Sequence, residues 1–285
     1  MHTTLGAVID LHLHSTCSDG SETPETIAEL AEAAGCAAIA LTDHDGLYGV
    51  ERARRRCKEL GVGFVPGCEV SCAFSPGTLH VLCYFVEPGD GPLQSELEAL
   101  RADRATRNER LLVKLQQIGL PITLAEVEAS AGGSVIGRPH FGSVLVANGA
   151  ATSIDDAFER LLGKGTPGYV PKARIEAATA IKAARGSGAV AVLAHPLSLG
   201  LEPAALGSAV SELSEAGLSG VECYYGRYSP EERARLVEIA GAHGLVATGG
   251  SDFHGRFKPD LAVGTGTGDL DVPTRALEEL TARKP

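Results

Sequence analysis

The stretch Val8–His14 reads VIDLHLH, and this short pattern decides the predicted fold. Apolar and β-branched residues open it, and two histidines close it with one residue between them. Alternation along a strand puts His12 and His14 on the same face, so both side chains can reach one point in space. We therefore interpret the stretch as a strand that delivers metal-competent side chains at its carboxyl end.

Six further apolar runs have the length of strands, and amphipathic segments rich in Ala, Leu and Glu separate most of them. The predicted strands are Val8–His14, Ala37–Thr42, Gly63–Val70, Leu79–Val86, Ala189–Ala194, Gly220–Tyr224 and Leu245–Gly249. Only a short connection joins the third strand to the fourth, so we expect these two to pair as a hairpin. The alternation predicts an α/β fold whose sheet forms a closed or nearly closed barrel.

One region, from Gly91 to Ala173, replaces the alternation with helical segments and no convincing strand. The helices expected there are Leu93–Ile118, Thr123–Ser130, Arg138–Asn148 and Ile154–Leu162. The predicted organisation is a barrel at residues 7–90 and 174–285 with a mainly helical insertion at 91–173. Insertions on the loop face of such barrels commonly form part of the substrate pocket, and an insertion without that function is the alternative.

Composition excludes several classes of protein. The 285 residues carry a formal net charge of −11, which disfavours a stable complex with nucleic acid but leaves a nucleotide substrate open. The apolar runs fall far short of the ~20 residues of a membrane span, and no signal peptide is apparent. Seven unevenly spaced cysteines then predict reduced thiols in a cytoplasmic protein.

Metal-competent side chains recur at the ends of the predicted strands. Besides His12 and His14, they are Asp19, His44, Glu69, His80, His195, Asp252 and His254. A single His-x-His pair is more often surface or core than a metal site, but the carboxyl ends of barrel strands face the active site. Gathering so many imidazoles and carboxylates without a cation would be unfavourable in a partly buried cleft. The mixed donors favour Mn²⁺, Fe²⁺ or Zn²⁺ over Mg²⁺ or Ca²⁺.

Six motifs in series resemble those of the polymerase and histidinol phosphatase (PHP) family. They are DLHLHSTCSDG at 10–20, LTDHD at 41–45, GCE at 67–69, His80, AHP at 194–196 and GSDFH at 250–254. The resemblance implies a distorted seven-stranded (β/α) barrel and three divalent ions. It implies that the first ion takes His12, His14, Glu69 and Asp252, that the second shares Glu69 with His80 and His195, and that the third takes Asp19, His44 and His254.

This ion set points to a phosphoesterase. Three divalent ions against three ligand carboxylates would leave a strongly cationic pocket, which favours a phosphate-bearing substrate. A hydroxide bridging the first two ions is the expected nucleophile, so no side chain is assigned as a general base.

Basic residues of the insertion are candidates for binding the rest of the substrate. Arg138 and His140, in the segment RPHF, are similar to the Arg-x-His element of PHP phosphatases with a helical insert, which implies contact with a second phosphate. A helix that begins at Arg138 would also favour phosphate at its N-terminus. Further candidates are Arg104 and Arg107 on the long predicted helix, and Lys172 where the insertion rejoins the barrel. For the two helix arginines, the alternative is that they belong to a solvated, salt-bridged surface.

The resemblance to that subgroup implies a phosphatase that removes the 3′-phosphate of nucleoside 3′,5′-bisphosphates, such as 3′-phosphoadenosine 5′-phosphate. Two other enzymes remain open: a 5′→3′ exonuclease on short RNA or DNA oligonucleotides, and a histidinol-phosphate phosphatase. A module that binds metal only for structure is the non-enzymatic alternative, and the nine filled ligand positions argue against it.

Overall fold

The computed structural model describes residues 8–132, 135–171 and 173–285, and its centre is one eight-stranded sheet. The strands are β1 (Val8–Leu13), β2 (Cys36–Leu41), β3 (Gly63–Ala73), β4 (Leu79–Tyr84), β5 (Ile175–Glu176), β6 (Val190–Leu193), β7 (Gly220–Tyr225) and β8 (Val246–Gly250). All seven predicted strands are present. The two-residue β5 was not predicted, because it is too short to show a periodic pattern.

The sheet runs in the order β1-β2-β3-β4-β6-β7-β8, with β5 beside β3. The predicted hairpin is confirmed, since β4 is antiparallel to β3 and also to β6, whereas the other pairs are parallel. The two edges meet at their carboxyl ends, where the Asp252 N–H donates to the His12 carbonyl at 2.8 Å and Leu13 bridges to Phe253. The sheet is therefore a nearly closed barrel.

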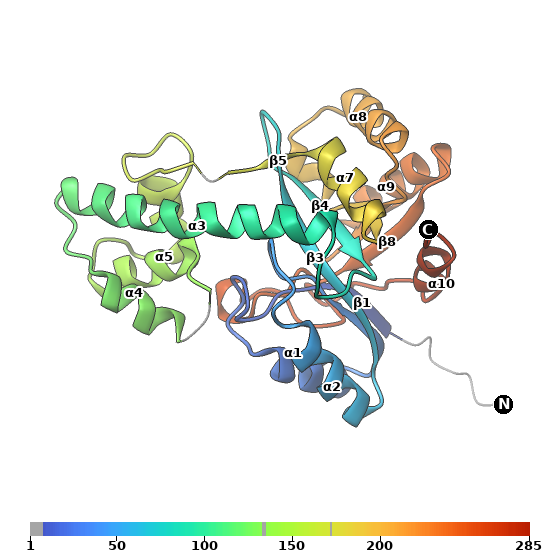
Figure 1. Ribbon diagram of the computed structural model, residues 1–285, viewed down its shortest axis with the longest axis horizontal. Coiled ribbons are helices and arrows are strands. Elements are labelled where there is room, and N and C mark those ends of the chain that lie inside the picture. Colours follow the sequence, from blue (N-terminus) through green and yellow to red (C-terminus); the bar gives the residue numbers. More distant parts are fainter. Residues whose placement is uncertain (1–7, 133–134, 172) are drawn as a thin grey trace.

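Helices cover the outside of this barrel (Figure 1). They are α1 (Pro24–Ala33), α2 (Val50–Leu60), α7 (Ala177–Gly186), α8 (Pro203–Glu215), α9 (Pro230–Ala242) and α10 (Arg275–Thr281), with short 3₁₀ turns at Pro196–Leu199 and Gly255–Phe257. Local sequence sets the first of them. The Thr23 hydroxyl accepts from the Thr26 N–H, Pro24 occupies the first turn, and Gly35 follows the helix at a φ of +73°.

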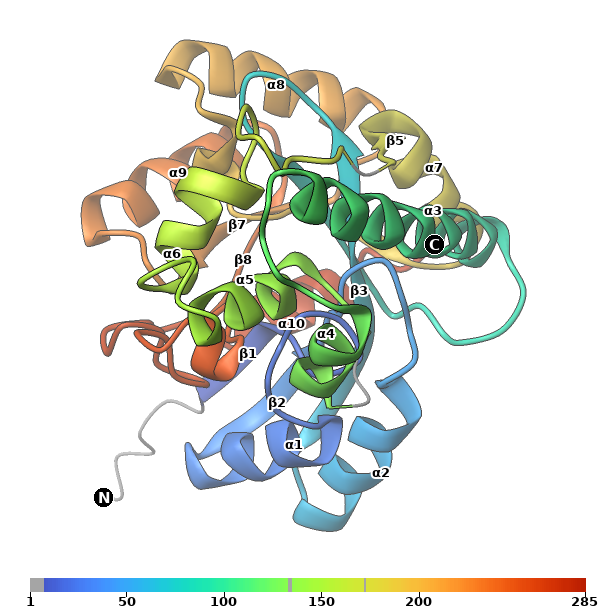
Figure 2. The same cartoon turned by 90° about the vertical axis from the view of Figure 1, so that its left-hand side faces the viewer.

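The segment between β4 and β5 is helical and lies to one side of the barrel (Figures 1 and 2). It contains α3 (Pro92–Gln117), α4 (Leu124–Ala131), α5 (Arg138–Ala147) and α6 (Ile154–Ala157), which continues into a π-helical turn at Phe158–Leu162. That turn departs from the single helix predicted at 154–162. The Gly163 N–H bonds to the Phe158 carbonyl, five residues back, and so ends the segment with wider winding.

Two hydrophobic cores share the long helix α3. Leu93, Leu97 and Leu100 pack into the largest barrel core, whereas Leu111 and Leu115 pack into a separate core formed with α4, α5 and α6. The helix therefore joins the two parts of the molecule directly. Within the described ranges, no helix is both long and apolar enough to cross a membrane.

Candidate metal centre

The nine residues predicted as metal ligands come together where the barrel strands end. Three overlapping sets have ligand atoms that all lie within 4.8 Å of one another. They are His14, Asp19, His44 and His254; His12, His14 and Glu69; and His44, Glu69 and His80. We call the nine residues the His–carboxylate cluster.

The first part of the cluster lies between β1, β3 and β8. The Nε2 atoms of His12 and His14 are 3.0 Å apart, and that of His14 lies 3.2 Å from Glu69 Oε2 and 3.3 Å from Asp252 Oδ1. His12 Nε2 is 3.5 Å from the same Asp252 oxygen. The four side chains that the resemblance assigns to the first ion therefore face a common point.

The second part surrounds the other oxygen of Glu69. Glu69 Oε1 lies 2.8 Å from His80 Nδ1 and 2.8 Å from His195 Nε2. His44 Nδ1 also approaches Glu69, at 3.1 Å from Oε2. The Glu69 carboxylate is thus in a position to bridge, with each oxygen turned to a different pair of imidazoles.

The third part is the most open. His254 Nε2 lies 3.3 Å from Asp19 Oδ1, and His44 Nε2 lies 3.7 Å from Asp19 Oδ2. His44 therefore adjoins both Asp19 and Glu69, whereas the resemblance assigns it to the third ion alone. The Asp19 side chain is 20% exposed, so this part of the cluster borders on solvent.

Outer hydrogen bonds turn three imidazoles so that their Nε2 lone pairs face the cluster. His12 Nδ1 faces the Glu222 carboxylate at 2.8 Å, and His254 Nδ1 faces the Asp252 carbonyl at 2.8 Å. Both partners can only accept, so each Nδ1 carries the proton. The Ser198 hydroxyl donates to the Thr78 carbonyl and so accepts from His195 Nδ1 at 2.8 Å. Metal-ligating histidines have this arrangement of an outer acceptor and an inward lone pair.

The electrostatics also fit cations at this position. Burial alone would lower the pKa of His14, but the Asp252 and Glu69 carboxylates outweigh it and raise the pKa to about 9. Burial would raise the pKa of Glu69, but nearby histidines hold it well below its usual range. Among the described residues, Asp19 Oδ1 and His44 Nδ1 are buried and make no hydrogen bond of good geometry, although an ion-pair partner in the cluster lies 3.3 Å from the first and 3.1 Å from the second. Mixed imidazole and carboxylate donors of this kind suit divalent transition metals.

A buried carboxylate outside the cluster, that of Asp43, holds one of the loops that carry cluster residues. Asp43 accepts hydrogen bonds from the Ser15 N–H, the Ser15 hydroxyl and the Ser18 hydroxyl, and so fixes the loop that leads to Asp19.

Two cluster residues have a positive φ, His195 at +24° and Asp252 at +56°. A backbone conformation with positive φ is unfavourable for non-glycine residues, and such conformations are concentrated at functional sites.

A second feature, which we call the arginine pocket, adjoins the cluster with a volume of about 180 Å³. Its lining includes Asp19, His44 and His80 from the cluster, Phe158, and four arginines, Arg104, Arg107, Arg138 and Arg174. The pocket therefore places four cationic side chains beside the candidate metal centre.

The four arginines differ in their partners. Arg104 forms an ion pair with Asp45, which also accepts from the Ser71 N–H at 2.8 Å. Arg107 is only 4% exposed, and its Nε and Nη1 have no hydrogen-bond partner among the described residues. Burial, together with Arg138 and Arg104, lowers the pKa of Arg107 to about 10. A buried guanidinium with unused donors is suited to an anion.

The remaining predicted substrate residues lie elsewhere. His140 is buried against Phe257, accepts from the Gly137 N–H through Nδ1, and is not part of the pocket lining. Lys172 lies outside the described residues.

The sequence pattern pointed neither to Arg174 nor to Glu222. Arg174 lies two residues beyond Lys172, where the basic character of the segment was the available signal. Glu222 follows Gly220 and Val221 in a predicted apolar strand, where a lone carboxylate is itself a signal.

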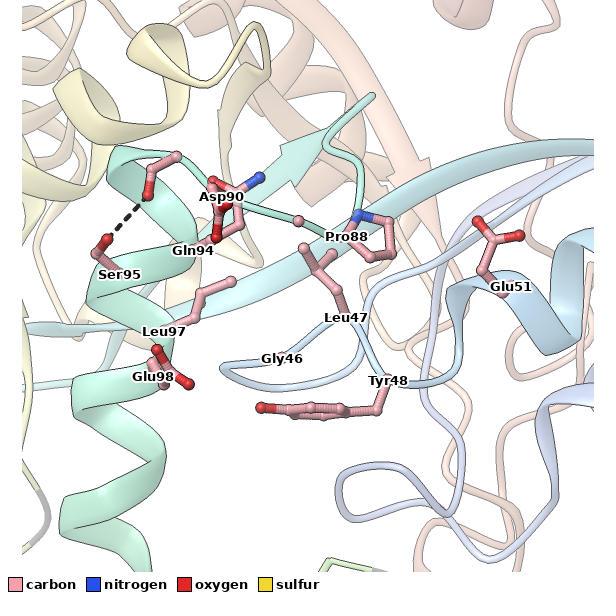
Figure 3. Close-up of a pocket in the computed structure, with 12 residues that line it drawn as sticks. Gly46, Leu47, Tyr48, Glu51, Pro88, Asp90, Gln94, Ser95, Leu97 and Glu98 are labelled. Carbon is pink, nitrogen blue, oxygen red and sulfur yellow. Dashed lines mark hydrogen bonds between the residues drawn. The ribbon is translucent and has the colours of Figure 1, made fainter.

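A larger pocket of about 380 Å³ lies apart from the cluster, between the loop after β2 and the start of α3 (Figure 3). Its lining shares no residue with the cluster and includes the carboxylates of Glu51, Asp90 and Glu98, which Figure 3 labels, but no basic side chain. Because three carboxylates and no basic side chain line it, this acidic pocket is unfavourable for a phosphate.

Comparison with known proteins agrees with this geometry. Residues 10–118 match the PHP domain model. The 3′,5′-nucleoside bisphosphate phosphatase of Chromobacterium violaceum is 32% identical over 97% of this chain and 98% of its own. The 5′-3′ exoribonuclease Rnm of Escherichia coli K12 is 32% identical over 88% of this chain and 87% of its own.

Solved structures give the same result. A provisionally assigned metal-dependent phosphoesterase from Bifidobacterium adolescentis superposes with a TM-score of 0.88 at 30% identity, covering 98% of this chain and 97% of that one. An amidohydrolase from Chromobacterium violaceum, solved with bound sulfate and no metal, gives a TM-score of 0.87 at 31% identity, covering 97% of each chain. The resemblance read from the six motifs is confirmed: the chain belongs to the PHP family of metal-dependent phosphoesterases.

Proposed function

We propose that this enzyme removes the 3′-phosphate from nucleoside 3′,5′-bisphosphates, such as 3′-phosphoadenosine 5′-phosphate. One observation carries the proposal: the arginine pocket and the His–carboxylate cluster share Asp19, His44 and His80. A phosphate held at the cluster and a second phosphate held by the arginines would therefore lie side by side. The Chromobacterium violaceum relative, a 3′,5′-nucleoside bisphosphate phosphatase, supports the same substrate class.

We assign three divalent ions to the cluster, with Mn²⁺ the first choice and Fe²⁺ or Zn²⁺ the alternatives. His12, His14, Glu69 and Asp252 would hold the first ion, Glu69, His80 and His195 the second, and Asp19, His44 and His254 the third. His44 lies near Glu69 as well, so it is the ligand whose assignment is most open to change. When bound, the ions would lower the pKa of a water molecule and neutralise charge on the reacting phosphate.

The chain's own side chains would bind and orient the substrate. Both oxygens of Glu69 are turned to imidazole nitrogens, so this carboxylate is not assigned as a general base. Arg107 would direct its unused N–H donors at the second phosphate. Arg138, the first residue of α5, would also donate to that phosphate. Asp45 holds Arg104 in place, so that its guanidinium is oriented before the substrate binds.

The helical segment would supply this second phosphate site. Arg104, Arg107, Arg138 and Phe158 belong to residues 91–173, whereas Arg174 begins the return to the barrel. We therefore assign 91–173 as a substrate-binding insertion in a barrel formed by 7–90 and 174–285. His140 would act indirectly, because its bond to the Gly137 N–H supports the start of α5.

The partners expected for such a site are small phosphorylated nucleotides. We also propose that the enzyme works in the cytoplasm, and the seven cysteines, which all lie in the described residues and are free thiols, support a reducing compartment.

A substrate panel tests the proposal. Metal-reconstituted enzyme would be assayed on a nucleoside 3′,5′-bisphosphate, a nucleoside 3′-monophosphate and histidinol phosphate, with kcat and KM measured for each. We expect the bisphosphate to have the highest kcat/KM. Comparable values for the bisphosphate and the monophosphate would contradict the two-phosphate site, and faster turnover of histidinol phosphate would replace the proposed substrate.

Arg138→Ala gives the residue-level test. Losing a charged hydrogen-bond partner should raise KM for the bisphosphate about tenfold or more and change the monophosphate far less. Arg110→Ala, on an exposed part of α3 outside the arginine pocket, is the matched control. Equal losses on both substrates would refute the role given to Arg138.

A second candidate activity is removal of nucleotides from the 5′ end of short oligonucleotides. The Escherichia coli relative named as a 5′-3′ exoribonuclease favours it, because the similarity covers most of both chains. Rates measured on oligonucleotides of increasing length separate the two activities. A rate per enzyme that holds or rises with length would favour the exonuclease, and a steep fall would favour the bisphosphate.

A further inference from the structure

Glu222 is a buried carboxylate of β7 that the proposed function leaves without a role. It is fully buried, and each of its two oxygens accepts one hydrogen bond from a residue of the cluster. Oε1 lies 2.8 Å from His12 Nδ1, and Oε2 accepts from the His195 backbone N–H at 2.6 Å. His12 is carried by β1 and His195 follows β6, so one carboxylate joins two ligands from separate strands.

We propose that Glu222 is a positioning residue that sets His12 and His195 together for metal binding. The inference rests on the proposed metal centre and adds to it a residue that touches no ion. Through Oε1, Glu222 fixes the proton of His12 on Nδ1 and leaves the Nε2 lone pair facing the cluster. Through Oε2, it holds the backbone of His195 at a φ of +24°, where the side chain reaches back to Glu69.

The chemistry of the two bonds requires a carboxylate. Both partners are donors, an imidazole N–H and a backbone N–H, so two acceptor oxygens are needed. An amide has one acceptor oxygen and one NH₂ group, so Gln at this position can accept from the His12 Nδ1–H or from the His195 N–H but not from both. Glu222→Gln therefore removes one bond with almost no change in volume.

A role in folding alone does not account for this arrangement. Among the described residues, Glu222 forms an ion pair with His12 and with no lysine or arginine, so its cationic partner is a cluster residue that must be neutral to bind metal. Bound cations beyond the His12 ring would compensate that charge. The nearby Tyr84 provides a contrast, because its hydroxyl also makes a buried hydrogen bond, to the Leu11 carbonyl at 2.9 Å, but among the described residues it forms no hydrogen bond with a side chain of the cluster.

The test compares metal binding by the full-length wild type, Glu222→Gln and Tyr84→Phe. Metal-free protein would be titrated with Zn²⁺ and with Mn²⁺ against a competing chelator, and the ions retained would be counted by elemental analysis. We expect Glu222→Gln to bind about 10- to 100-fold more weakly at the positions that use His12 and His195. The position formed by Asp19, His44 and His254 should keep its ion.

Co²⁺ absorption gives a readout of ligand geometry. The d–d bands of the Co²⁺-loaded protein should change in Glu222→Gln and stay as in the wild type in Tyr84→Phe. Thermal unfolding of the metal-free forms controls for stability, and we expect both variants to lose a similar, modest amount.

The outcomes separate this inference from the proposed function. If the wild type binds metal and Glu222→Gln matches it in affinity, number of ions and Co²⁺ spectrum, the positioning role is wrong and the metal centre stands. If the wild type itself retains no ion, the metal centre fails and the inference fails with it. If Tyr84→Phe weakens metal binding as much as Glu222→Gln, loss of any buried polar contact explains the effect and the specific role is overturned.

Discussion

The acidic pocket and the arginine pocket differ both in volume and in the charge of the residues that line them. The acidic pocket of Figure 3 has about twice the volume of the arginine pocket, roughly 380 against 180 Å³. Its charged lining residues are all carboxylates, whereas four arginines line the smaller pocket beside the cluster. Of these two pockets, the smaller is the one whose charge suits a phosphate, so volume is a poor guide to the substrate site.

The contrast also explains how an acidic chain can act on an anion. The net charge of −11 counts every carboxylate equally, but the carboxylates are not distributed equally. Those of Asp19, Glu69 and Asp252 face imidazoles at the cluster, and those of Glu51, Asp90 and Glu98 line a cavity with no basic side chain. The electrostatic potential at the substrate site depends on the charges that line that pocket, and the net charge of the whole chain is a poor guide to it.

The largest effect is expected at the residue that joins two parts of the cluster. Glu69→Gln keeps the shape of the side chain but removes the charge that both oxygens direct at imidazoles. We expect kcat/KM to fall by on the order of 10³-fold or more, with loss of bound metal. Elemental analysis and steady-state kinetics measure this, and circular dichroism controls for folding. More than a tenth of wild-type activity would contradict the bridging position of Glu69.

The effect expected next in size is a dependence of metal affinity on pH, which arises from protonation of the cluster. Without metal, the pKa of His14 is about 9, because the Asp252 and Glu69 carboxylates outweigh the effect of burial. Metal binds neutral imidazole, so below pH 9 binding must displace the proton of His14. Affinity should then fall by about tenfold per pH unit between pH 9 and 7.

Calorimetry measures that proton directly. Titrations with Zn²⁺ in two buffers of different ionisation enthalpy should show release of at least one more proton at pH 7 than at pH 10. The same proton count at both values would mean that His14 is not a ligand or is already neutral at pH 7.

The smallest effect is expected in the acidic pocket. Asp90→Asn and Glu98→Gln change the charge of the larger cavity without touching the cluster or the arginines. We expect kcat/KM for the bisphosphate to stay within about twofold of the wild type, since surface charges at a distance are screened by salt. A large change in either direction would show that the two pockets act together on the substrate.

The sequence was sufficient to predict most of the fold, because the strands are buried and the helices have clear ends. The seven apolar runs became seven strands, and Thr23, Pro24 and Gly35 stand at the ends of α1, where such residues are common. The short β5 and the π-helical turn at Phe158–Leu162 were beyond prediction. Each depends on where neighbouring segments lie, and neither leaves a periodic pattern in its own residues.

The metal-ligand candidates were predictable for a similar reason. Strand ends meet at one rim of a barrel, so His12, Glu69 and Asp252 could be grouped without a structure. The residues that orient them could not. Glu222 contacts His12 at a separation of 210 residues, and only the barrel closure brings the two together. The unpaired donors of Arg107 depend on burial between two cores, which helical spacing alone does not reveal.

The helix α3 has a consequence for how the enzyme selects among phosphates. At 1.5 Å per residue its 26 residues extend about 39 Å, and it is anchored in the barrel core at one end and in the helical core at the other. Arg104 and Arg107 lie between the anchors, where a sharp kink would cost backbone hydrogen bonds. The helix therefore holds these two arginines at a fixed place relative to the barrel that carries the cluster. On the proposed function, a substrate must place its two phosphates at the separation between the cluster and these arginines, and a molecule with another spacing would lose one contact or the other.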